Sequence, residues 1–186
     1  MEIKLREDPN PDTDFYYHHQ FKVYHDSYLI WDRDTWEAVL STCTVYWIEV
    51  DGKYAGDVII EDWRKGTKSI IDFSVLPEYQ GRGVGRAALE KVKEMGGKFT
   101  AVTRKETVDF FLNCEFVLKK LIKNYYHPGV DGYYIAWSLR GPRTWCGGVP
   151  ARRTGVTARR RGNLNRLLPP DQVRGRNDDA EIFGMR

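Results

Sequence analysis

Residues 80–86 (QGRGVGR) combine glycine and arginine at a spacing that suits the binding of a phosphate group. They follow an apolar stretch that ends at Pro77, and they precede a run of good helix formers, so they predict a turn that opens a helix. The first N–H groups of a helix have no intrahelical partner and together carry about half a positive charge. Glycine lets a phosphate approach those groups, and Arg82 and Arg86 add positive charge. We therefore expect a pyrophosphate site at this turn.

The glycine spacing excludes two common phosphate-binding motifs. A P-loop requires Gly-x-x-x-x-Gly-Lys-Ser/Thr, which is absent here. The dinucleotide-binding fingerprint requires Gly-x-Gly-x-x-Gly and an acidic residue about 20 positions later, whereas Gly81, Gly83 and Gly85 simply alternate. A glycine-rich turn that only joins a strand to a helix remains the structural alternative.

The order of a strand, Pro77-Glu78-Tyr79 and then Gln80-x-x-Gly83-x-Gly85 resembles the acyl-CoA loop of the GNAT superfamily of N-acyltransferases. That signature is Gln/Arg-x-x-Gly-x-Gly/Ala at the start of a helix. The resemblance implies that the loop binds the pyrophosphate of acetyl-CoA and that the strand before it contacts the pantetheine arm. The implied cosubstrate-binding residues are Val75, Gln80, Gly81, Arg82, Gly83, Val84, Gly85 and Arg86.

Transfer to an amine requires a group that takes the proton of the amine. A primary amine with a pKa near 10.4 is only about 0.04% neutral at pH 7, and a carboxylate can act as the base. Asp72 lies in the middle of the expected strand 69–76, whose alternation predicts Ile70, Asp72 and Ser74 on one face. Its alternative role is a structural ion pair or plain exposure. Glu61 and Asp62 are second candidates, with ordinary turn charges as their alternative.

Two further roles are implied by the resemblance. The backbone N–H of Phe73 would stabilise the oxyanion, a role that needs no particular side chain. Many GNAT proteins use a tyrosine hydroxyl to protonate the leaving thiolate, but Phe111 occupies that position here and Glu115 occupies a glycine position that follows it. Tyr125, Tyr126 or Cys114 would be the substitutes, and the sequence places none of them at the sulfur.

The histidines and aromatic residues of the segment 16–25 suggest a second component of the site. Histidines 18, 19 and 25 cluster there, but no metal-ligand spacing accompanies them, so we expect no metal. Family members shape the acceptor site with this segment, so Tyr16, Tyr17, His18 and Tyr24 are candidates to line it. An aromatic helix packed on the sheet is the interpretation that the pattern favours.

The elements expected to position these residues alternate between strands and helices. Strands are predicted at 3–7, 45–50, 54–61, 69–76, 98–103, 116–122 and 133–139. Helices are predicted at 16–25, at 34–40 with Asp34 as its N-cap, at 83–95 and at 106–113. Asp51-Gly52 predicts a two-residue hairpin turn. The order predicts an α+β fold with a mixed, mostly antiparallel sheet flanked by helices. It matches the GNAT fold, in which strands 69–76 and 98–103 run parallel and splay apart.

Charge divides the 186 residues into two parts. Residues 1–140 carry 19 Lys and Arg against 22 Asp and Glu, a net charge of −3, and they form the expected N-acetyltransferase domain. Residues 141–186 carry 10 Arg, no Lys and 4 acids, a net charge of +6, which predicts a basic, disordered tail. Such a tail suggests nucleic-acid binding, although the abrupt change in composition favours an incidental extension.

Several classes of protein are excluded by the remaining features. No run of about 18 apolar residues exists, and the charged N-terminus does not resemble a signal peptide. The three cysteines are too few and too widely spaced to form a disulfide framework. We therefore expect a cytoplasmic protein without a membrane partner. The expected function is transfer of an acetyl group from acetyl-CoA to a small-molecule, peptide or protein amine by direct attack in a ternary complex. The alternatives are a non-catalytic CoA-binding module and a nucleic-acid binder. A homodimer is compatible with the sequence.

Overall fold

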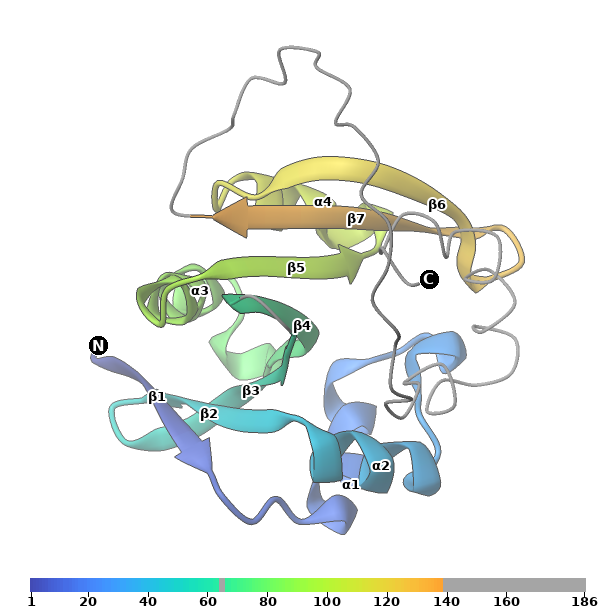
Figure 1. Cartoon of the computed structure of the whole chain (residues 1–186). Coiled ribbons are helices and arrows are strands. Elements are labelled where there is room, and N and C mark those ends of the chain that lie inside the picture. The colour runs from blue at the N-terminus through green and yellow to red at the C-terminus, as the bar shows by residue number, and fades with distance from the viewer. Residues whose placement is uncertain (64–65, 139–186) are drawn as a thin grey trace, which may run out of the picture.

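One seven-stranded sheet runs through the molecule in the order β1-β2-β3-β4-β5-β7-β6 (Figure 1). This computed structural model describes residues 1–63 and 66–138. All neighbouring strands are antiparallel except β4 and β5, which are parallel, so the predicted mixed sheet is confirmed. The strands are β1 (Ile3–Asp8), β2 (Thr44–Val50), β3 (Lys53–Asp62), β4 (Thr67–Val75), β5 (Lys98–Thr103), β6 (Val117–His127) and β7 (Val130–Ser138). The expected end of the domain at residue 140 and the tail 141–186 lie outside the described residues.

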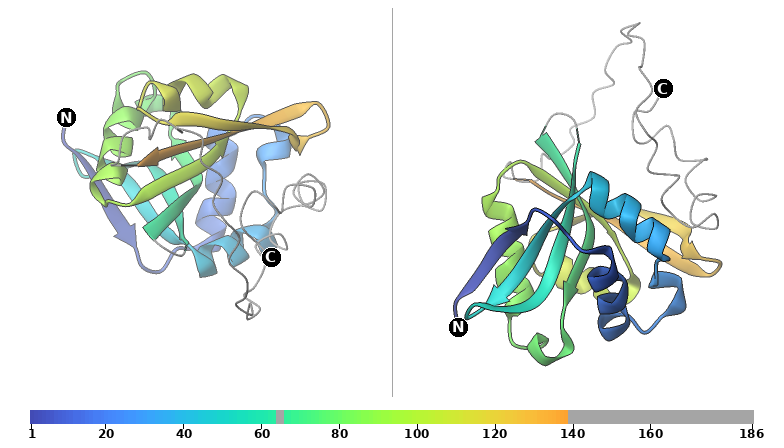
Figure 2. Two further views of the ribbon diagram at one scale, coloured as in Figure 1. Left: turned by 45° about the horizontal axis from the view of Figure 1, so that its top comes forward. Right: turned by 90° about the horizontal axis from the view of Figure 1, so that it is seen from below.

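In the part of the chain that the structure describes, four α-helices cover the two faces of this sheet (Figure 2). On one face, α1 (Thr13–Val23) and α2 (Arg33–Thr42) pack over a core that includes Tyr16, Trp36 and Ile59. On the other face, α3 (Val84–Glu94) and α4 (Lys105–Leu112) pack over a larger core. The short helices η1 (Ser27–Leu29) and η3 (Pro77–Tyr79) lie between longer elements. Among the described residues, no helix has the length and apolar character to cross a membrane.

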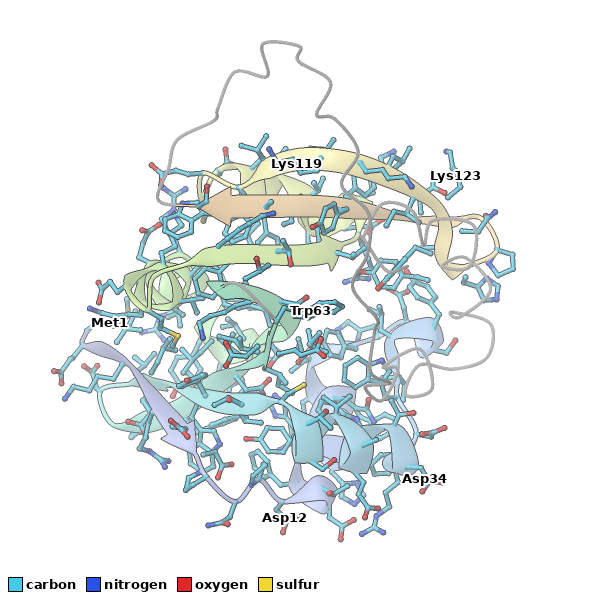
Figure 3. The ribbon with its side chains drawn as sticks, viewed as in Figure 1. Met1, Asp12, Asp34, Trp63, Lys119 and Lys123 are labelled. Atoms are coloured by element: carbon cyan, nitrogen blue, oxygen red, sulfur yellow. The ribbon has the colours of Figure 1, made fainter. Side chains whose placement is uncertain are left out.

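The structure confirms the predicted hairpin turn but not the predicted N-cap of α2. Asp51 and Gly52 take φ values of 49° and 78°, as a two-residue hairpin turn with two left-handed residues requires, so that prediction is confirmed. The N-cap of α2 is Asp32, whose carboxylate accepts a hydrogen bond from the N–H of Thr35 at 2.7 Å. The prediction of Asp34 as the cap is therefore wrong, and Asp34 lies in the first turn, at the edge of the molecule (Figure 3).

The parallel pairing of β4 with β5 ends at Ile70. Thr67 to Ile70 pair with β5, with Ile70 opposite Ala101, and the ladder stops there. On the other side of β4 the register with β3 shifts, which leaves Ile71 as an extra residue. A bulge of this kind bends its strand and redirects the side chains that follow. Beyond it, β3 is the only strand of the described residues that pairs with β4, which leaves backbone groups on the β5 side of β4 for another partner.

The bulge overturns part of the predicted strand alternation. The pattern predicts Ile70, Asp72 and Ser74 on one face of β4. Ile70 instead packs into the core of α3 and α4, together with Phe73, while Ile71 packs into the core of α1 and α2. Asp72 and Ser74 do share a face, because both hydrogen-bond to residues of the α1 side.

Gly56 allows β3 to approach this part of β4 closely. A Cβ at Gly56 would lie 2.2 Å from the backbone oxygen of Ser74, a distance that no side-chain atom can occupy. Gly56 pairs with Val75, the last residue of β4. The glycine therefore fixes the end of β4, from which the glycine-rich loop begins.

Candidate active site

The loop between β4 and α3 has the geometry of an anion site. Gly81 and Gly83 have φ values of 69° and 81°, in the left-handed region that glycine adopts without strain. Gly83 is the N-cap of α3 and offers no side chain to cap the helix. The first N–H groups of α3 are therefore not capped by that residue and carry the positive end of the helix dipole. The Val84 side chain is buried, so the backbone of this residue is what the loop can present.

Polar side chains brace this loop against β4. Nε2 of Gln80 donates a hydrogen bond to the backbone oxygen of Val75 at 2.8 Å, so this predicted binding residue holds the loop to the strand. Arg82 is exposed, with a long hydrogen bond of 3.4 Å to the backbone oxygen of Glu78, and Arg86 is also exposed. Arg82 lies in the loop and Arg86 in the first turn of α3, so both add positive charge at this end of the helix.

Aromatic rings pack beneath the first turn of α3. A Cβ on Gly85 would lie 3.3 Å from the ring of Phe110 and 3.7 Å from the ring of Phe73. Phe110 and Phe73 contact Phe111, which is 6% exposed. Gly85 thus permits close packing of α3 over these rings, and Phe111 has no proton to donate.

Asp72 lies immediately after the bulge, where β4 has lost β5 as a neighbour. Its Oδ1 accepts a hydrogen bond from the hydroxyl of Tyr24, the C-cap residue of α1. Burial raises the pKa of Asp72 above its usual value, whereas hydrogen bonds from Tyr24 and from the backbone N–H of Phe73 act in the opposite direction. The candidate base and the candidate oxyanion donor are therefore adjacent in space as well as in sequence.

A second carboxyl group, which the sequence analysis missed, lies beside Asp72. Asp57 on β3 is fully buried, and it accepts a hydrogen bond from Tyr54 at 2.6 Å. Nε2 of His19 lies 3.3 Å from Asp57 and 3.2 Å from the hydroxyl of Ser74. The signal that identified Asp72, a carboxylate in the middle of an apolar strand, applies equally to Asp57 and could have found it.

Asp57, Asp72, His19, Ser74 and Tyr54 form a largely buried polar cluster between β3, β4 and α1. Some of the other candidate residues join this cluster and some lie elsewhere. Tyr24 is part of the cluster, whereas Tyr16 is buried and donates to Asp8 at 3.0 Å, and His18 is exposed. Glu61 accepts a hydrogen bond from Trp63, which Figure 3 labels, and Asp62 pairs with Lys68. These two carboxylates lie at the far end of β3, so the structure does not bring them to Asp72.

The connection between α1 and α2 contacts both β4 and the residue that follows β5, beyond the point where these two strands separate. Tyr24 hydrogen-bonds to Asp72 on β4, while Asp26 accepts a hydrogen bond of 2.6 Å from Arg104, which follows β5. Tyr28 lies against the ring of Tyr126 on β6, at 6.4 Å between centroids. The guanidinium of Arg104 is thus engaged with Asp26.

Tyr126, one of the three candidate substitutes for the family tyrosine, lies close enough to Asp72 for their charges to interact. Its hydroxyl donates a hydrogen bond of 2.8 Å to the backbone oxygen of Val102, beyond the last β4–β5 pair. Burial raises the pKa of Tyr126 well above normal, and the charge of Asp72 contributes. Cys114 is buried in the core of α3 and α4, and Tyr125 is 8% exposed. No group of three His, Cys, Asp or Glu residues suited to a metal occurs in the described ranges 1–63 and 66–138.

Comparison with known proteins identifies the family. Residues 4–113, more than half of the chain, match the model of the acetyltransferase (GNAT) family. The chain therefore belongs to the GNAT family of acetyltransferases, as the loop sequence implied. No curated protein matches the chain.

Solved structures share its fold at low sequence identity. The ribosomal-protein-S18-alanine N-acetyltransferase from Escherichia coli superposes with a TM-score of 0.63 at 18% identity, over 76% of this chain and 98% of that one. A chimeric spermidine N-acetyltransferase from Vibrio cholerae gives 0.60 at 14% identity, over 73% and 95%. A GNAT acetyltransferase from Elizabethkingia anophelis with acetyl-CoA bound gives 0.55 at 16% identity, over 74% and 97%. These likenesses establish the fold.

Proposed function

We propose that this protein is an N-acetyltransferase that moves the acetyl group of acetyl-CoA to an amine by direct attack in a ternary complex. One observation carries the proposal: the glycine loop at the start of α3 follows the end of β4, and Asp72 lies on the same strand where β5 departs. The proposed anion site therefore follows directly from the strand that carries the proposed proton acceptor. Family membership supports the use of acetyl-CoA.

The residues of the loop fit the pyrophosphate of this cosubstrate. Apart from its chain neighbours, no atom of the described residues lies within 4 Å of a Cβ placed on Gly83, so an anion can approach the backbone there. Arg82 and Arg86 would neutralise its charge, while Gln80 keeps the loop in place through Val75. The backbone of β4 beyond the bulge would hydrogen-bond the pantetheine arm.

The reacting end would lie beside Asp72 and Phe73. Asp72 would take a proton from the amine, since its raised pKa makes it a better base than an exposed carboxylate. The N–H of Phe73, which bonds to the Asp72 carboxylate in the free protein, would instead stabilise the negative oxygen that forms at the thioester carbonyl once the substrates are bound. The acceptor is proposed to be a small-molecule, peptide or protein amine; two structural neighbours are named for spermidine and for a ribosomal protein alanine.

A non-catalytic CoA-binding protein is the second candidate, and the phenylalanine at position 111 favours it. Phe111 is buried among other rings and offers no hydroxyl for the leaving thiolate. Thiolate is a tolerable leaving group, and Tyr126 retains a proton at neutral pH, so this substitution does not exclude turnover. Nucleic-acid binding through residues 141–186 remains a prediction from composition alone.

The decisive experiment separates binding from turnover. Calorimetric titration with acetyl-CoA, with free CoA and ATP as controls, tests the loop, and a screen of amines for release of CoA thiol tests the chemistry. Binding of acetyl-CoA but not ATP, with thiol release that Asp72→Asn reduces, is the expected result. Binding without thiol release for any amine would favour the second candidate. No binding would refute the proposal.

A further inference from the structure

Asp57 has one carboxylate oxygen without a hydrogen-bond partner in residues 1–63 and 66–138. The residue is 0% exposed, at the middle of β3. Its Oδ2 interacts with Tyr54 at 2.6 Å and His19 at 3.3 Å, but Oδ1 meets no donor. A buried oxygen left in this state costs stability unless a proton or another partner satisfies it.

The Asp72 carboxyl is the acidic neighbour of Asp57. In the β3–β4 ladder Asp57 pairs with Ser74, and Asp72 pairs two residues further along β3, with Ile59, so both carboxyl groups point to the α1 side of the sheet. The two groups interact with each other, and burial raises the pKa of both. Two negative charges this close, away from water, are unfavourable without a cation to balance them.

The groups that face the pair in the described structure supply no positive charge at neutral pH. Burial lowers the pKa of His19 to about 4, so its ring is neutral. The remaining titratable groups are hydroxyls whose pKa values are raised, chiefly by burial, so they are neutral as well: Tyr16 and Tyr24 from the α1 segment, Tyr54 from β3 and Tyr126 from β6. One proton is therefore needed within the pair.

We propose that Asp57 is a positioning residue of the transfer reaction, which holds one proton beside Asp72 so that the pair meets the acceptor with a single negative charge. The inference rests on the proposed function, because that function makes Asp72 the proton acceptor. Asp57 is fully buried and Asp72 only partly so, which places the proton on the inner group and the charge on the outer one. A single charge matches a single ammonium ion.

The proton balance of the reaction is complete with this arrangement. An acceptor that arrives as an ammonium ion gives one proton to the carboxylate of Asp72. The freed lone pair of the nitrogen forms the C–N bond at the thioester carbonyl, the C–S bond breaks, and a second proton of the nitrogen passes to the sulfur. Asp72 then releases its proton to solvent. The products are an amide, a thiol and one proton, and Asp57 keeps its own proton throughout.

Infrared spectroscopy of the whole protein tests where the proton lies, independently of activity. At pH 7 the wild type should give the C=O stretch of a protonated carboxyl group, and Asp57→Asn should lose it. Glu94→Gln, which removes a surface carboxylate paired with Lys91, should retain it. Absence of the band in the wild type, or its survival in Asp57→Asn, would overturn the proposal even if acetyl-CoA binds and thiol is released.

The pH profile of kcat/KM tests the effect on Asp72. Asp57→Val removes the O–H that stabilises the Asp72 carboxylate, so the acid limb should move to higher pH by about one unit. Asp57→Asn keeps an N–H donor and should move the limb less. A purely structural role would lower stability in both variants and leave the limb in place. Thermal unfolding and acetyl-CoA binding of each variant show that the fold and the loop are intact.

Discussion

The hydroxyl of Tyr24 donates a hydrogen bond to Oδ1 of Asp72 and so joins the end of α1 to β4 directly after its bulge. The bond stabilises the ionised form of a carboxyl group whose pKa burial would otherwise raise further. The segment that follows α1 therefore takes part in setting the basicity of the candidate base, besides covering it.

Tyr24→Phe should make Asp72 harder to ionise. A hydrogen bond to a charged group contributes about 1.5–3 kcal/mol, so we expect the acid limb of the kcat/KM profile to move up by about one pH unit. Tyr17→Phe is the matched control on the same helix, since the Tyr17 ring contacts His18 and Phe21. An unmoved limb in Tyr24→Phe would show that the reaction does not depend on Asp72.

Gly83→Asp should weaken acetyl-CoA binding through its charge. The position has a φ of 81°, which Asn and Asp tolerate better than most residues, and a Cβ there meets no atom of the described structure beyond its chain neighbours. Gly83→Asn therefore carries the same backbone strain without the charge. We expect the Kd of the Asp variant to exceed that of the Asn variant by about tenfold or more, because the added carboxylate faces the bound phosphates. Equal calorimetric Kd values for the Asp and Asn variants would show that the loop does not bind the phosphates.

The sequence predicted the loop well because its signals are local. Glycine spacing, a preceding strand and a following helix act within a few residues, and the structure has Gly83 as the N-cap of α3. The bulge at Ile71 was not predictable in this way, since it depends on how β4 pairs with β3. Asp57 became significant only when that pairing brought it to the face of Asp72. The sequence pattern predicted Asp34 as the N-cap of α2, whereas the backbone geometry has Asp32 in that place.

Glu115 illustrates a departure from the family pattern that the structure explains. It takes a φ of 64° in the turn three residues after the end of α4 at Leu112. There the N–H of Phe116 bonds to the backbone oxygen of Phe111, in a C-terminal helix turn whose left-handed residue is usually glycine. Its carboxylate lies 3.1 Å from Nζ of Lys93, a mostly buried side chain. The ion pair gives a reason for an acidic residue at a position where glycine is less strained.

Glu115→Gly and Glu115→Ala should separate these two effects. Both variants lose the contact with Lys93, which retains Glu90 at 2.7 Å. Only the glycine variant relieves the left-handed backbone, so we expect it to unfold at a higher temperature than the alanine variant. An alanine variant as stable as the glycine variant would show that the turn has relaxed out of this conformation.

The stability of the protein at different pH values should reveal the buried carboxyl pair. Burial raises the pKa of Asp57 well above its ordinary value of about 3.9, and the charge of Asp72 raises it further. Between about pH 4 and that raised pKa the unfolded chain has lost this proton and the folded protein has not, so stability falls as pH rises. Asp57→Asn removes this dependence, and its stability relative to wild type should increase by up to about 1.4 kcal/mol per pH unit.

His19 has the opposite effect and makes the comparison between variants necessary. Its folded pKa of about 4 lies below its ordinary value of 6.5, so its contribution to stability is lost as pH falls between these values. Both effects are present in the wild-type curve, and only the difference between Asp57→Asn and wild type isolates the carboxyl pair. Glu94→Gln, on the surface of α3, should give a difference that does not grow from pH 4 to pH 7. A constant difference for Asp57→Asn as well would mean that Asp57 is ionised in the folded protein, and the pair would then require a cation at this site.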